Sequence, residues 1–364
     1  MTRWTPTDEQ RRDWLRLARS ENVGPVTFEQ LIQHHGDATT ALAALPDLAR
    51  RGGRIKPLAI PTIAEAEREL AAGATIGAKL LLNREAAFPR LLAHVDPPPP
   101  LIWVRGNASL LSRPIIAVVG ARIASAAGQR FARGLAADLG RAGYVVVSGM
   151  ARGIDAAAHD GALASGTVAV LGGGVDDIYP AENAGLYARL AAEGCVVSES
   201  PIGHRAQAKD FPRRNRLISG LSLGVVVVEA EMRSGSLITA RLAAEQGREV
   251  FAVPGSPIDP RAAGCNDLIR QGATLCANAE DVLRVIDSLP RLEEPHGEPY
   301  RAQPAVPPPD LVERIAKLLT DAPVSRDDLC RAAGAPAPMV AAALVELSLA
   351  GRAQLLAGGL VSAA

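Results

Sequence analysis

The chain has little lysine, few aromatic residues and no excess of either charge. Only 4 of its 39 basic residues are lysine, aromatic residues make up 3% of the 364 positions, and 39 acidic residues balance the basic ones. A chain without net charge has no overall field that attracts nucleic acid or a membrane surface. Any such partner must therefore be recognised by a local patch.

Cysteine and long apolar runs are scarce as well. The four cysteines are scattered without a Cys-x-x-Cys pair, which argues against a zinc site or a disulfide framework and favours buried thiols in a reducing compartment. No apolar run reaches the roughly 18 residues that span a bilayer. The charged first 19 residues contain no apolar core of a secretion signal. We therefore expect a cytoplasmic protein without a membrane span.

What the chain does have is enough apolar material for a core: 48% of its residues are hydrophobic and 21% are charged. A proline-rich stretch over residues 290–309 contains seven prolines and is typical of a semi-rigid linker. We therefore expect several domains. These are a helical domain over residues 1–80, a central domain over 84–289 and a C-terminal domain over 310–364.

The first part of the chain has helical apolar spacing. The pattern predicts helices over Asp8–Arg19 and Thr27–His34, joined by a turn at Asn22-Val23-Gly24-Pro25. Such a turn is found in helix-hairpin-helix motifs, which hold a DNA backbone phosphate. It is also common in helical hairpins with no ligand, and this purely structural alternative is favoured.

The central part alternates short β-branched runs with alanine-rich helical stretches. This alternation predicts right-handed βαβ units and therefore a parallel sheet. A closed barrel of such units needs about eight strands, and the sequence predicts six, so we expect an open, doubly wound sheet. The predicted strands are Ile115–Val119, Tyr144–Val147, Thr167–Leu171, Cys195–Ser198, Gly224–Val228 and Glu249–Val253. The predicted helices are Ser125–Arg141, Asp155–Ser165, Glu182–Glu193, Pro212–Leu221 and Ser236–Gly247.

Glycine, serine and charged residues follow every predicted strand. Ligands of open α/β sheets bind beyond the carboxyl ends of the strands, so these turns are expected to converge on one crevice. Glycine-rich turns that lead into a helix N-terminus favour phosphate. The turns are Gly120-Ala121-Arg122, Ser148 to Asp155, Gly172-Gly173-Gly174, Glu199, Glu229 through Ser234-Gly235-Ser236, and Pro254-Gly255-Ser256.

The usual nucleotide signatures are missing from these turns. Arg122 and Ser125 replace the second and third glycines of a dinucleotide fingerprint, and no lysine follows a glycine as a Walker motif requires. Asp155 and His159 could form half of a metal site, but a helix-capping aspartate beside a structural histidine is favoured. We therefore expect no catalytic residue, no metal and no cofactor.

A basic cluster points to a single-stranded nucleic acid. Residues 204–216 read HRAQAKDFPRRNR, with five lysines and arginines against one acid. Phe211 stands inside this cluster, so a base could stack on its ring while the cations neutralise phosphates. The alternative is a solvated basic loop around a core phenylalanine.

Seven segments of the chain resemble one family in order. They are VVGAR (118–122), SGMARGIDAAAH (148–159), AVLGGGVDDIYPAEN (169–183), FPRRNRLISGLS (211–222), VVVEA (226–230), SGSLITA (234–240) and AVPGS (252–256). The chain resembles the DprA/Smf family of DNA-processing proteins over about residues 84 to 275. The resemblance implies an extended Rossmann-like domain, with a SAM-like or helix-hairpin-helix-like domain before it.

The resemblance also implies a function. Proteins of this family bind single-stranded DNA without sequence preference and protect incoming strands in natural transformation. They self-associate, here expected as a homodimer, and help to load RecA past single-strand-binding protein. No catalysis is implied.

The resemblance assigns binding residues position by position. Arg122 matches the arginine of the family's Gly-Ser/Ala-Arg turn, and Phe211 and Arg214–Arg216 match its FPxRNR motif, whereas Arg213 fills a variable position. With the strand-end turns, the candidate nucleic-acid-binding residues are Gly120, Arg122, Ser148, Gly149, Arg152, Gly153, Lys209, Phe211, Arg213, Arg214, Asn215, Arg216, Ser234, Gly235 and Ser236.

An enzyme is the alternative reading. Nucleoside-monophosphate phosphoribohydrolases also use a Rossmann sheet, with a PGGxGTxxE motif. The nearest segment here, Gly172 to Asp176, lacks the threonine and the glutamate. Asp155, Glu199 and Glu229 are the available strand-end carboxylates, and we expect them to form loops and helix caps instead.

The C-terminal part predicts a winged helix. Its expected helices are Asp310–Leu319, Arg326–Ala333 and Pro336–Leu349, followed by a wing over Arg352–Val361. The presumptive recognition helix, Pro336 to Ala350, contains no lysine or arginine and one acid, Glu346. Groove binding needs phosphate neutralisation, so this domain is expected to bind protein or to regulate rather than to read DNA.

Overall fold

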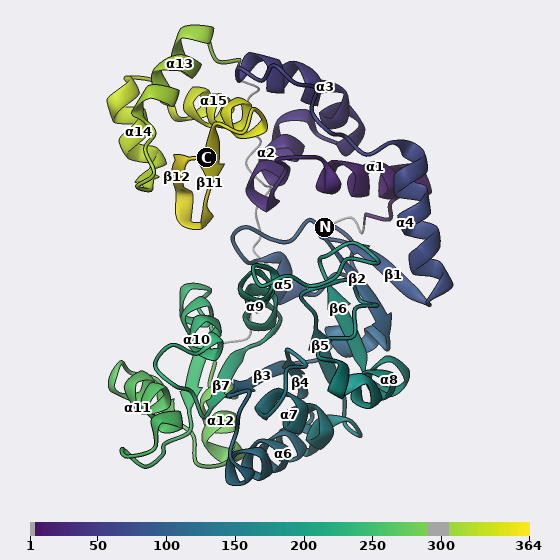
Figure 1. Ribbon diagram of the computed structural model, residues 1–364, viewed down its shortest axis with the longest axis vertical. Helices are drawn as coiled ribbons and strands as arrows, with labels where there is room; N and C mark the ends of the chain where they lie inside the picture. The colour runs from purple at the N-terminus through teal and green to yellow at the C-terminus, as the bar shows by residue number, and fades with distance from the viewer. Residues whose placement is uncertain (1–3, 290–305) are drawn as a thin grey trace. The chain divides into compact units, whose positions relative to one another are not determined.

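The chain divides into two compact units in the computed structural model, which describes residues 4–289 and 306–364. The first unit joins Met1–Leu70, Asp96–Leu101 and Glu294–Ala364, and the second joins Ala71–Val95 and Ile102–Glu293 (Figure 1). The predicted proline-rich linker lies mostly at 290–305, outside the described residues. The two ends of the chain therefore share one unit, which the sequence did not predict.

The second unit is built on a sheet that has nine strands within the described residues. They are β1 (Ala78–Leu82), β2 (Leu101–Gly106), β3 (Ile115–Gly120), β4 (Val145–Ser148), β5 (Thr167–Val170), β6 (Cys195–Ser198), β7 (Gly224–Val228), β8 (Glu249–Ala252) and β9 (Thr274–Leu275). Their order is β1-β2-β6-β5-β4-β3-β7-β8-β9. The six predicted strands are β3 to β8, and they pair in parallel. The predicted doubly wound parallel sheet is thus confirmed.

The sequence missed the strands at the two edges of the sheet. Strand β2 pairs antiparallel with β6, with Trp103 opposite Ser198. An antiparallel strand needs no crossover helix, so strand–helix alternation gives no sign of β2 or of the edge strand β1 beyond it. The short strand β9 has only two residues, Thr274 and Leu275.

Helices cover both faces of this sheet, as Figure 1 shows. One face buries side chains of α6 (Ala126–Arg141), α7 (Ile154–Ala162) and α12 (Ala279–Ile286). The other face buries side chains of α5 (Arg90–Ala93), α9 (Asp210–Leu221), α10 (Gly235–Glu245) and α11 (Ala263–Arg270). Helix α8 (Ala184–Glu193) lies between β5 and β6 in the sequence, and short 3-10 helices occur at Ala108–Ser112, Ala181–Asn183 and Pro260–Ala262.

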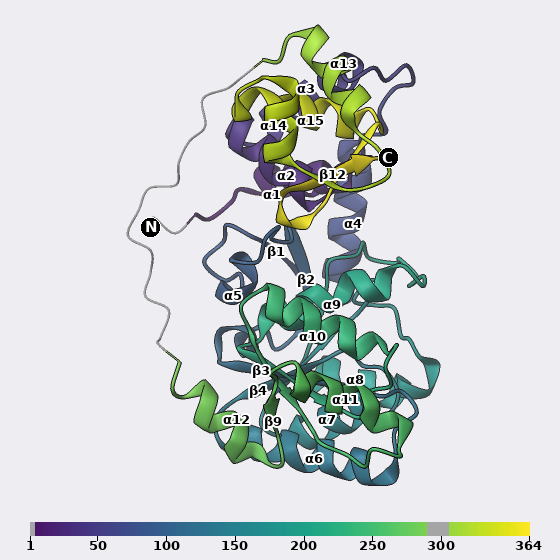
Figure 2. The same cartoon turned by 90° about the vertical axis from the view of Figure 1, so that its left-hand side faces the viewer.

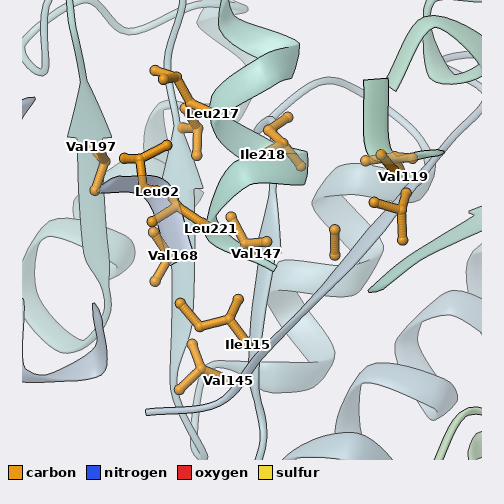
Figure 3. Packing of buried hydrophobic residues seen from close by; sticks show 14 of the residues in the cluster. Leu92, Ile115, Val119, Val145, Val147, Val168, Val197, Leu217, Ile218 and Leu221 are labelled. Atoms are coloured by element: carbon orange, nitrogen blue, oxygen red, sulfur yellow. The ribbon is translucent and has the colours of Figure 1, made fainter. Parts of the chain in front are cut away.

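Packing of α9 fixes the position of the basic cluster. Leu217, Ile218 and Leu221 are at most 2% exposed and lie against valines of the sheet such as Val147 and Val168 (Figure 3). Burying each such side chain contributes about 1.5–3 kcal/mol. The apolar stripe therefore holds α9 flat on the sheet, with its basic first turns beyond the carboxyl ends of the strands.

The order of the strands creates a switch point between β3 and β7. The chain runs outward from β3 to β6 and then returns to place β7 on the other side of β3, with Gly120 opposite Val228. At such a point the loops that follow the two neighbouring strands separate, and Rossmann folds bind their nucleotide there. What occupies this point is decisive for function.

The first unit combines helices from the two ends of the chain (Figure 2). The N-terminal part contains α1 (Asp8–Arg19), α2 (Pro25–His35), α3 (Ala38–Arg51) and α4 (Ile63–Thr75), the last of which crosses the boundary between the units. The C-terminal part contains α13 (Pro309–Leu318), α14 (Arg326–Ala333), α15 (Ala337–Leu349), the strands β10 (Val324–Ser325), β11 (Ala353–Leu355) and β12 (Leu360–Ala363), and a 3-10 turn at Ala357–Gly359. The strands form an antiparallel β10-β12-β11 sheet. The predicted winged helix is confirmed.

Among the described residues, no single helix has the length and apolar character needed to cross a bilayer. The pair α14 and α15 reaches that composition only when both helices are counted together across a bend of 107°.

Candidate nucleic-acid interface

A guanidinium group and two aromatic rings meet beyond the carboxyl ends of β3 and β5. The guanidinium carbon of Arg122 lies 5.5 Å from the centre of the Phe211 ring. The Tyr179 ring lies on the same phenylalanine, with ring centres 5.3 Å apart and planes tilted by 42°. We call these three residues, with the turns after β3, β4 and β5 and the first turns of α9, the strand-end site. It brings together segments that are far apart in the sequence.

An acid lies in the first turn of α9. The helix begins at Asp210, two residues before the predicted start at Pro212. Asp210 accepts hydrogen bonds from the backbone N–H of Gln207 and from Nε2 of His204, both at 2.9 Å. Burial acts to raise the pKa of Asp210, but these hydrogen bonds outweigh it and the pKa is lowered. The carboxylate stabilises a helix end that carries several cations.

The exposed half of the basic cluster consists of Lys209 and Arg213. Both side chains are exposed, and no ion pair within the described residues engages either of them. Arg122 on the opposite turn is exposed as well. Arg205 is exposed but forms an ion pair with Asp177 at 2.9 Å. The strand-end site therefore presents at least three cations to solvent.

Arg214, the neighbour of Arg213, is buried instead. It is 7% exposed, and its Nη1 donates to the carbonyls of Gly149, at 2.6 Å, and Val170. Burial lowers the pKa of Arg214 to about 10, and nearby Arg122 adds to the effect. Arg214 was expected to face phosphate, but its Nη1 donates to backbone carbonyls at the ends of β4 and β5. A contact between Arg214 and DNA stays a prediction.

Asn215 and Arg216 also hold the site together from within. Asn215 Nδ2 donates to the carbonyl of Gly235 at 3.2 Å, which ties α9 to the start of α10. Arg216 Nη2 lies 2.7 and 2.6 Å from the two carboxylate oxygens of Glu199 at the end of β6. Both residues were predicted to bind nucleic acid, and both are occupied by partners in the protein.

A buried carboxylate lies under the turn that follows β4. Asp155 is 6% exposed and its Oδ2 accepts hydrogen bonds from the backbone N–H groups of Gly149, at 3.2 Å, and Ala151, at 3.3 Å. Burial raises the pKa of Asp155, and the charge of Arg214 opposes the rise. Ser148 is also buried and donates to the carbonyl of Val118 at 2.7 Å. These groups shape the turn rather than face a ligand.

His159, which together with Asp155 was considered as half of a metal site, interacts with Thr167 instead. Its Nδ1 lies 2.7 Å from the hydroxyl of Thr167, which itself donates to the carbonyl of Val146. Because that hydroxyl proton is used, the imidazole must donate from Nδ1, which leaves Nε2 as a buried acceptor without a partner. Among the described residues, no group of three or more potential ligands could hold a metal ion.

Backbone strain is concentrated at the strand ends. Met150 after β4 and Glu229 after β7 are non-glycine residues with positive φ, at 58° and 53°. Gly153, with φ of 75°, passes so close to Ala121 that a Cβ there would collide with its carbonyl oxygen. Such conformations cost about 1–3 kcal/mol each and are typical of functional sites.

Glu229 occupies the switch point between β3 and β7. Its carboxylate accepts hydrogen bonds from the backbone N–H of Ser125, at 2.8 Å, and from the Ser125 hydroxyl, at 2.5 Å. Ser125 is the residue that caps α6. A carboxylate therefore stands at the helix N-terminus where a dinucleotide-binding fold would hold pyrophosphate.

The remaining predicted residues surround the site. Arg152 is exposed and lies 3.6 Å from Glu182. The hydroxyls of Ser234 and Ser236, at the start of α10, are 2.5 Å apart. Tyr179 was missed by the sequence analysis, although the scarcity of aromatic residues could have drawn attention to it. Asn183, which donates to the Met150 carbonyl at 2.9 Å, was also missed, and nothing in the sequence around it indicates this contact.

The chain matches three family models in order. Residues 79–287 match a model described as DNA recombination-mediator protein A. Residues 8–72 match a DprA-like N-terminal HHH domain, and residues 299–359 match a DprA winged helix domain. The first model alone covers more than half of the chain.

Individual relatives agree with these models. The chain is 43% identical over 281 residues to Protein Smf of Escherichia coli K12, which covers 75% of this chain and 74% of the relative. The X-ray structure of DprA from Streptococcus pneumoniae superposes with a TM-score of 0.64 at 33% identity, over 77% of this chain and 98% of that one. A Helicobacter pylori DprA structure, described as giving insights into its single-stranded DNA binding mode, has a TM-score of 0.53 at 28% identity, over 57% and 95%.

Proposed function

This chain belongs to the DprA/Smf family of DNA-processing proteins, and from that premise we propose that its strand-end site binds single-stranded DNA without sequence preference. The observation that carries the proposal is the Arg122 guanidinium placed 5.5 Å from the Phe211 ring, with Tyr179 on the same ring. A cation next to an aromatic surface is the chemistry that takes a phosphate and its base together.

The charges of the site fit a strand of phosphates. Arg122, Lys209 and Arg213 are exposed on two segments that meet at Phe211, and Arg152 lies on the turn after β4. An extended strand of DNA presents one phosphate per nucleotide. Several cations at separate positions can therefore each bind one phosphate, whereas a closed pocket for a single anion could not. Exposed arginines pair with phosphate oxygens through a planar fork of donors.

The chemistry of the site also supports binding without a base code. Bases are distinguished by amide and guanidinium contacts to their edges, and the one amide in the basic cluster besides Gln207, Asn215, is bonded to Gly235. Stacking on Phe211 and Tyr179 suits any base, because every base has a π-face. Binding is therefore expected to tolerate any sequence.

We further propose that the strand is not chemically changed. The three strand-end carboxylates all have structural partners: Asp155 accepts from a turn, Glu199 pairs with Arg216, and Glu229 accepts from Ser125, the cap of α6. A general base or nucleophile needs a carboxylate that is free to meet the substrate. The segment nearest to the phosphoribohydrolase motif, Gly172 to Asp176, also lacks the threonine and the glutamate of that motif.

The biological role proposed is that of the family. The protein would protect incoming single strands in natural transformation and help to load RecA past single-strand-binding protein. It would act as a homodimer in the cytoplasm. Support for this part is membership of the family alone.

The test compares a labelled oligothymidylate with its duplex by gel shift and by fluorescence anisotropy at several salt concentrations. If four cations meet phosphates, log K should fall with log salt with a slope of about −3 for a single strand. Preference for duplex would contradict the proposal. Release of free base from nucleoside monophosphates would contradict the non-catalytic part.

Arg141→Ala supplies the matched control. This arginine is exposed at the C-terminal end of α6, at the opposite edge of the sheet, where it pairs with Asp138. Its removal changes the net charge as Arg122→Ala does. It should leave the affinity for the single strand almost unchanged.

A further inference from the structure

The helical hairpin of the N-terminal part is in contact with the winged helix. Asn22, in the turn between α1 and α2, donates from Nδ2 to the carbonyl of Leu349 at 3.2 Å. The hydroxyl of Thr27 in α2 lies 3.2 Å from that of Ser348, and both side chains are buried. Leu349 and Ser348 form the last turn of α15, the presumptive recognition helix, which lies beside α2 and α3 in both views (Figures 1 and 2).

The end of α3 makes a second contact with the same helix. Gly52 follows α3 so close to α15 that a Cβ there would collide with the carbonyl of Glu346. Arg51 Nη2 lies 2.6 Å from the carboxylate of Glu346, which is only 1% exposed. Arg352 Nη1 donates to the carbonyl of Gly52 at 3.1 Å and also pairs with Glu313. Close backbone approach and an ion pair between an exposed arginine and a buried carboxylate indicate a specific interface.

The charges at this interface do not suit DNA. A helix-hairpin-helix holds phosphate with backbone N–H groups at the N-terminus of its second helix. Here residues 20–28 contain one acid, Glu21, and no lysine or arginine. The carbonyl end of α15, which carries about half a negative charge, is directed at the turn through the Asn22–Leu349 hydrogen bond. The Leu349 carbonyl therefore lies on the turn that precedes α2, the part of a helix-hairpin-helix that a phosphate would approach.

Helix α15 is equally unsuited to a DNA groove. It contains no basic residue, and Val345 to Leu349 are all buried. One side of the helix contributes Val340, Leu344 and Leu347 to the core of the winged helix. The opposite side meets α2 and α3 through Glu346 and Ser348. No cationic face remains for phosphate.

We infer that the two terminal DNA-binding motifs are each other's ligands: the hairpin at Asn22–Thr27 docks on the carbonyl end of α15, and neither motif takes DNA. The DNA affinity of the full chain comes from the strand-end site. This last statement rests on the proposed function.

A reversible disulfide in the full chain tests this inference. The Thr27 and Ser348 hydroxyls are close enough for Thr27→Cys and Ser348→Cys to form a disulfide with little movement. The native cysteines are buried or half-buried, and each single variant controls for them. The double variant is expected to oxidise without forming a covalent dimer. Its affinity for a single-stranded oligonucleotide should change by less than about twofold on reduction.

Two results would overturn the inference. Failure of the folded double variant to form the disulfide would mean that the interface is absent in solution. A severalfold gain in affinity for single-stranded or duplex DNA on reduction would mean that the hairpin opens to bind it. The disulfide yield does not depend on DNA, so it remains decisive even if the proposed function fails.

Hydrogen exchange of the unmodified protein covers the case in which the double variant does not fold. Saturation with a single-stranded oligonucleotide should slow exchange in residues 209–221 and leave residues 20–31 unchanged. Slower exchange at the hairpin would contradict the inference. Unchanged exchange at both segments would contradict the proposed function instead.

Discussion

Glu229 holds the capping residue of the helix that follows the first predicted strand, because its carboxylate accepts hydrogen bonds from both the backbone N–H and the hydroxyl of Ser125. These residues are 104 positions apart and belong to the loops on either side of the switch point between β3 and β7. The protein thus supplies its own anion where related architectures bind a cofactor phosphate. The phosphate contacts proposed for this chain therefore lie elsewhere than those of a dinucleotide enzyme.

Replacement of Glu229 should destabilise the central unit. Glu229→Gln removes the charge that interacts with the N-terminus of α6 and weakens two hydrogen bonds, for an expected loss of about 1–2 kcal/mol. Urea unfolding measures the change. The control is Glu231→Gln, two residues further along the chain at an exposed position, and it should leave the free energy of unfolding unchanged. Equal stability of the two variants would mean that the cap contributes nothing.

Arg122 and Phe211 should affect DNA binding differently. Arg122→Ala removes a phosphate contact, so the affinity for a single strand should fall by about 1–3 kcal/mol and the salt slope should become shallower by about 0.7. Phe211→Ala should cost about 1–3 kcal/mol through lost stacking with little change in slope. Anisotropy titrations at several salt concentrations measure both quantities. An unchanged affinity in Arg122→Ala would exclude the strand-end site.

The adjacent residues Arg213 and Arg214 should separate binding from stability. Arg214→Ala leaves buried Asp155 without its cation and the carbonyls of Gly149 and Val170 without a donor, so unfolding should become easier by about 3 kcal/mol or more. Arg213→Ala removes an exposed side chain and should change stability by less than about 0.5 kcal/mol while weakening DNA binding. Equal stability losses would contradict the assignment of roles.

Acid should destabilise the central unit through His159. Burial, with a contribution from Arg214, lowers the pKa of His159 from 6.5 to about 3. An unfolded chain therefore binds this proton first, and stability that is complete above pH 6.5 is lost as the pH falls. The loss from this residue should reach about 2 kcal/mol between pH 6.5 and about 4.5.

The matched variant for that measurement is His159→Asn, whose amide can keep the donor to Thr167. Denaturant unfolding of the two proteins at several pH values isolates the contribution of the histidine, because all other titrating groups are shared. Parallel pH profiles would show that His159 is not held neutral in the folded protein.

The burial of Arg214 follows from its spacing along α9 and could have been predicted from the sequence. Arg214 lies three, four and seven residues before Leu217, Ile218 and Leu221, so it occupies the apolar stripe of its own helix. Arg213 is one position earlier, about 100° around the helix, and faces away from the sheet. The expectation that Arg214, Asn215 and Arg216 face the ligand came from the basic cluster and from the resemblance to the family's FPxRNR motif, and neither separates the buried face of a helix from its exposed face.

Other features had no local signal. Tyr179 and Phe211 come from different loops, and the contact between Asn22 and Leu349 joins residues 327 positions apart. The sequence analysis did not predict strand β2, because nothing in its own residues specifies an antiparallel partner. Each of these features depends on tertiary contacts between segments that are far apart in the sequence.

The sequence by itself determined the parallel sheet, the winged helix and the gathering of glycines and charges beyond the strand ends. These follow from local periodicity and from the rule that parallel strands share one carboxyl edge. Only the tertiary structure decided which cations reach solvent, which carboxylate fills the switch point and what the terminal motifs bind. Those outcomes depend on the burial of particular faces and on pairs of residues far apart in the chain, and burial decides whether a charge is available to a ligand or committed to the fold.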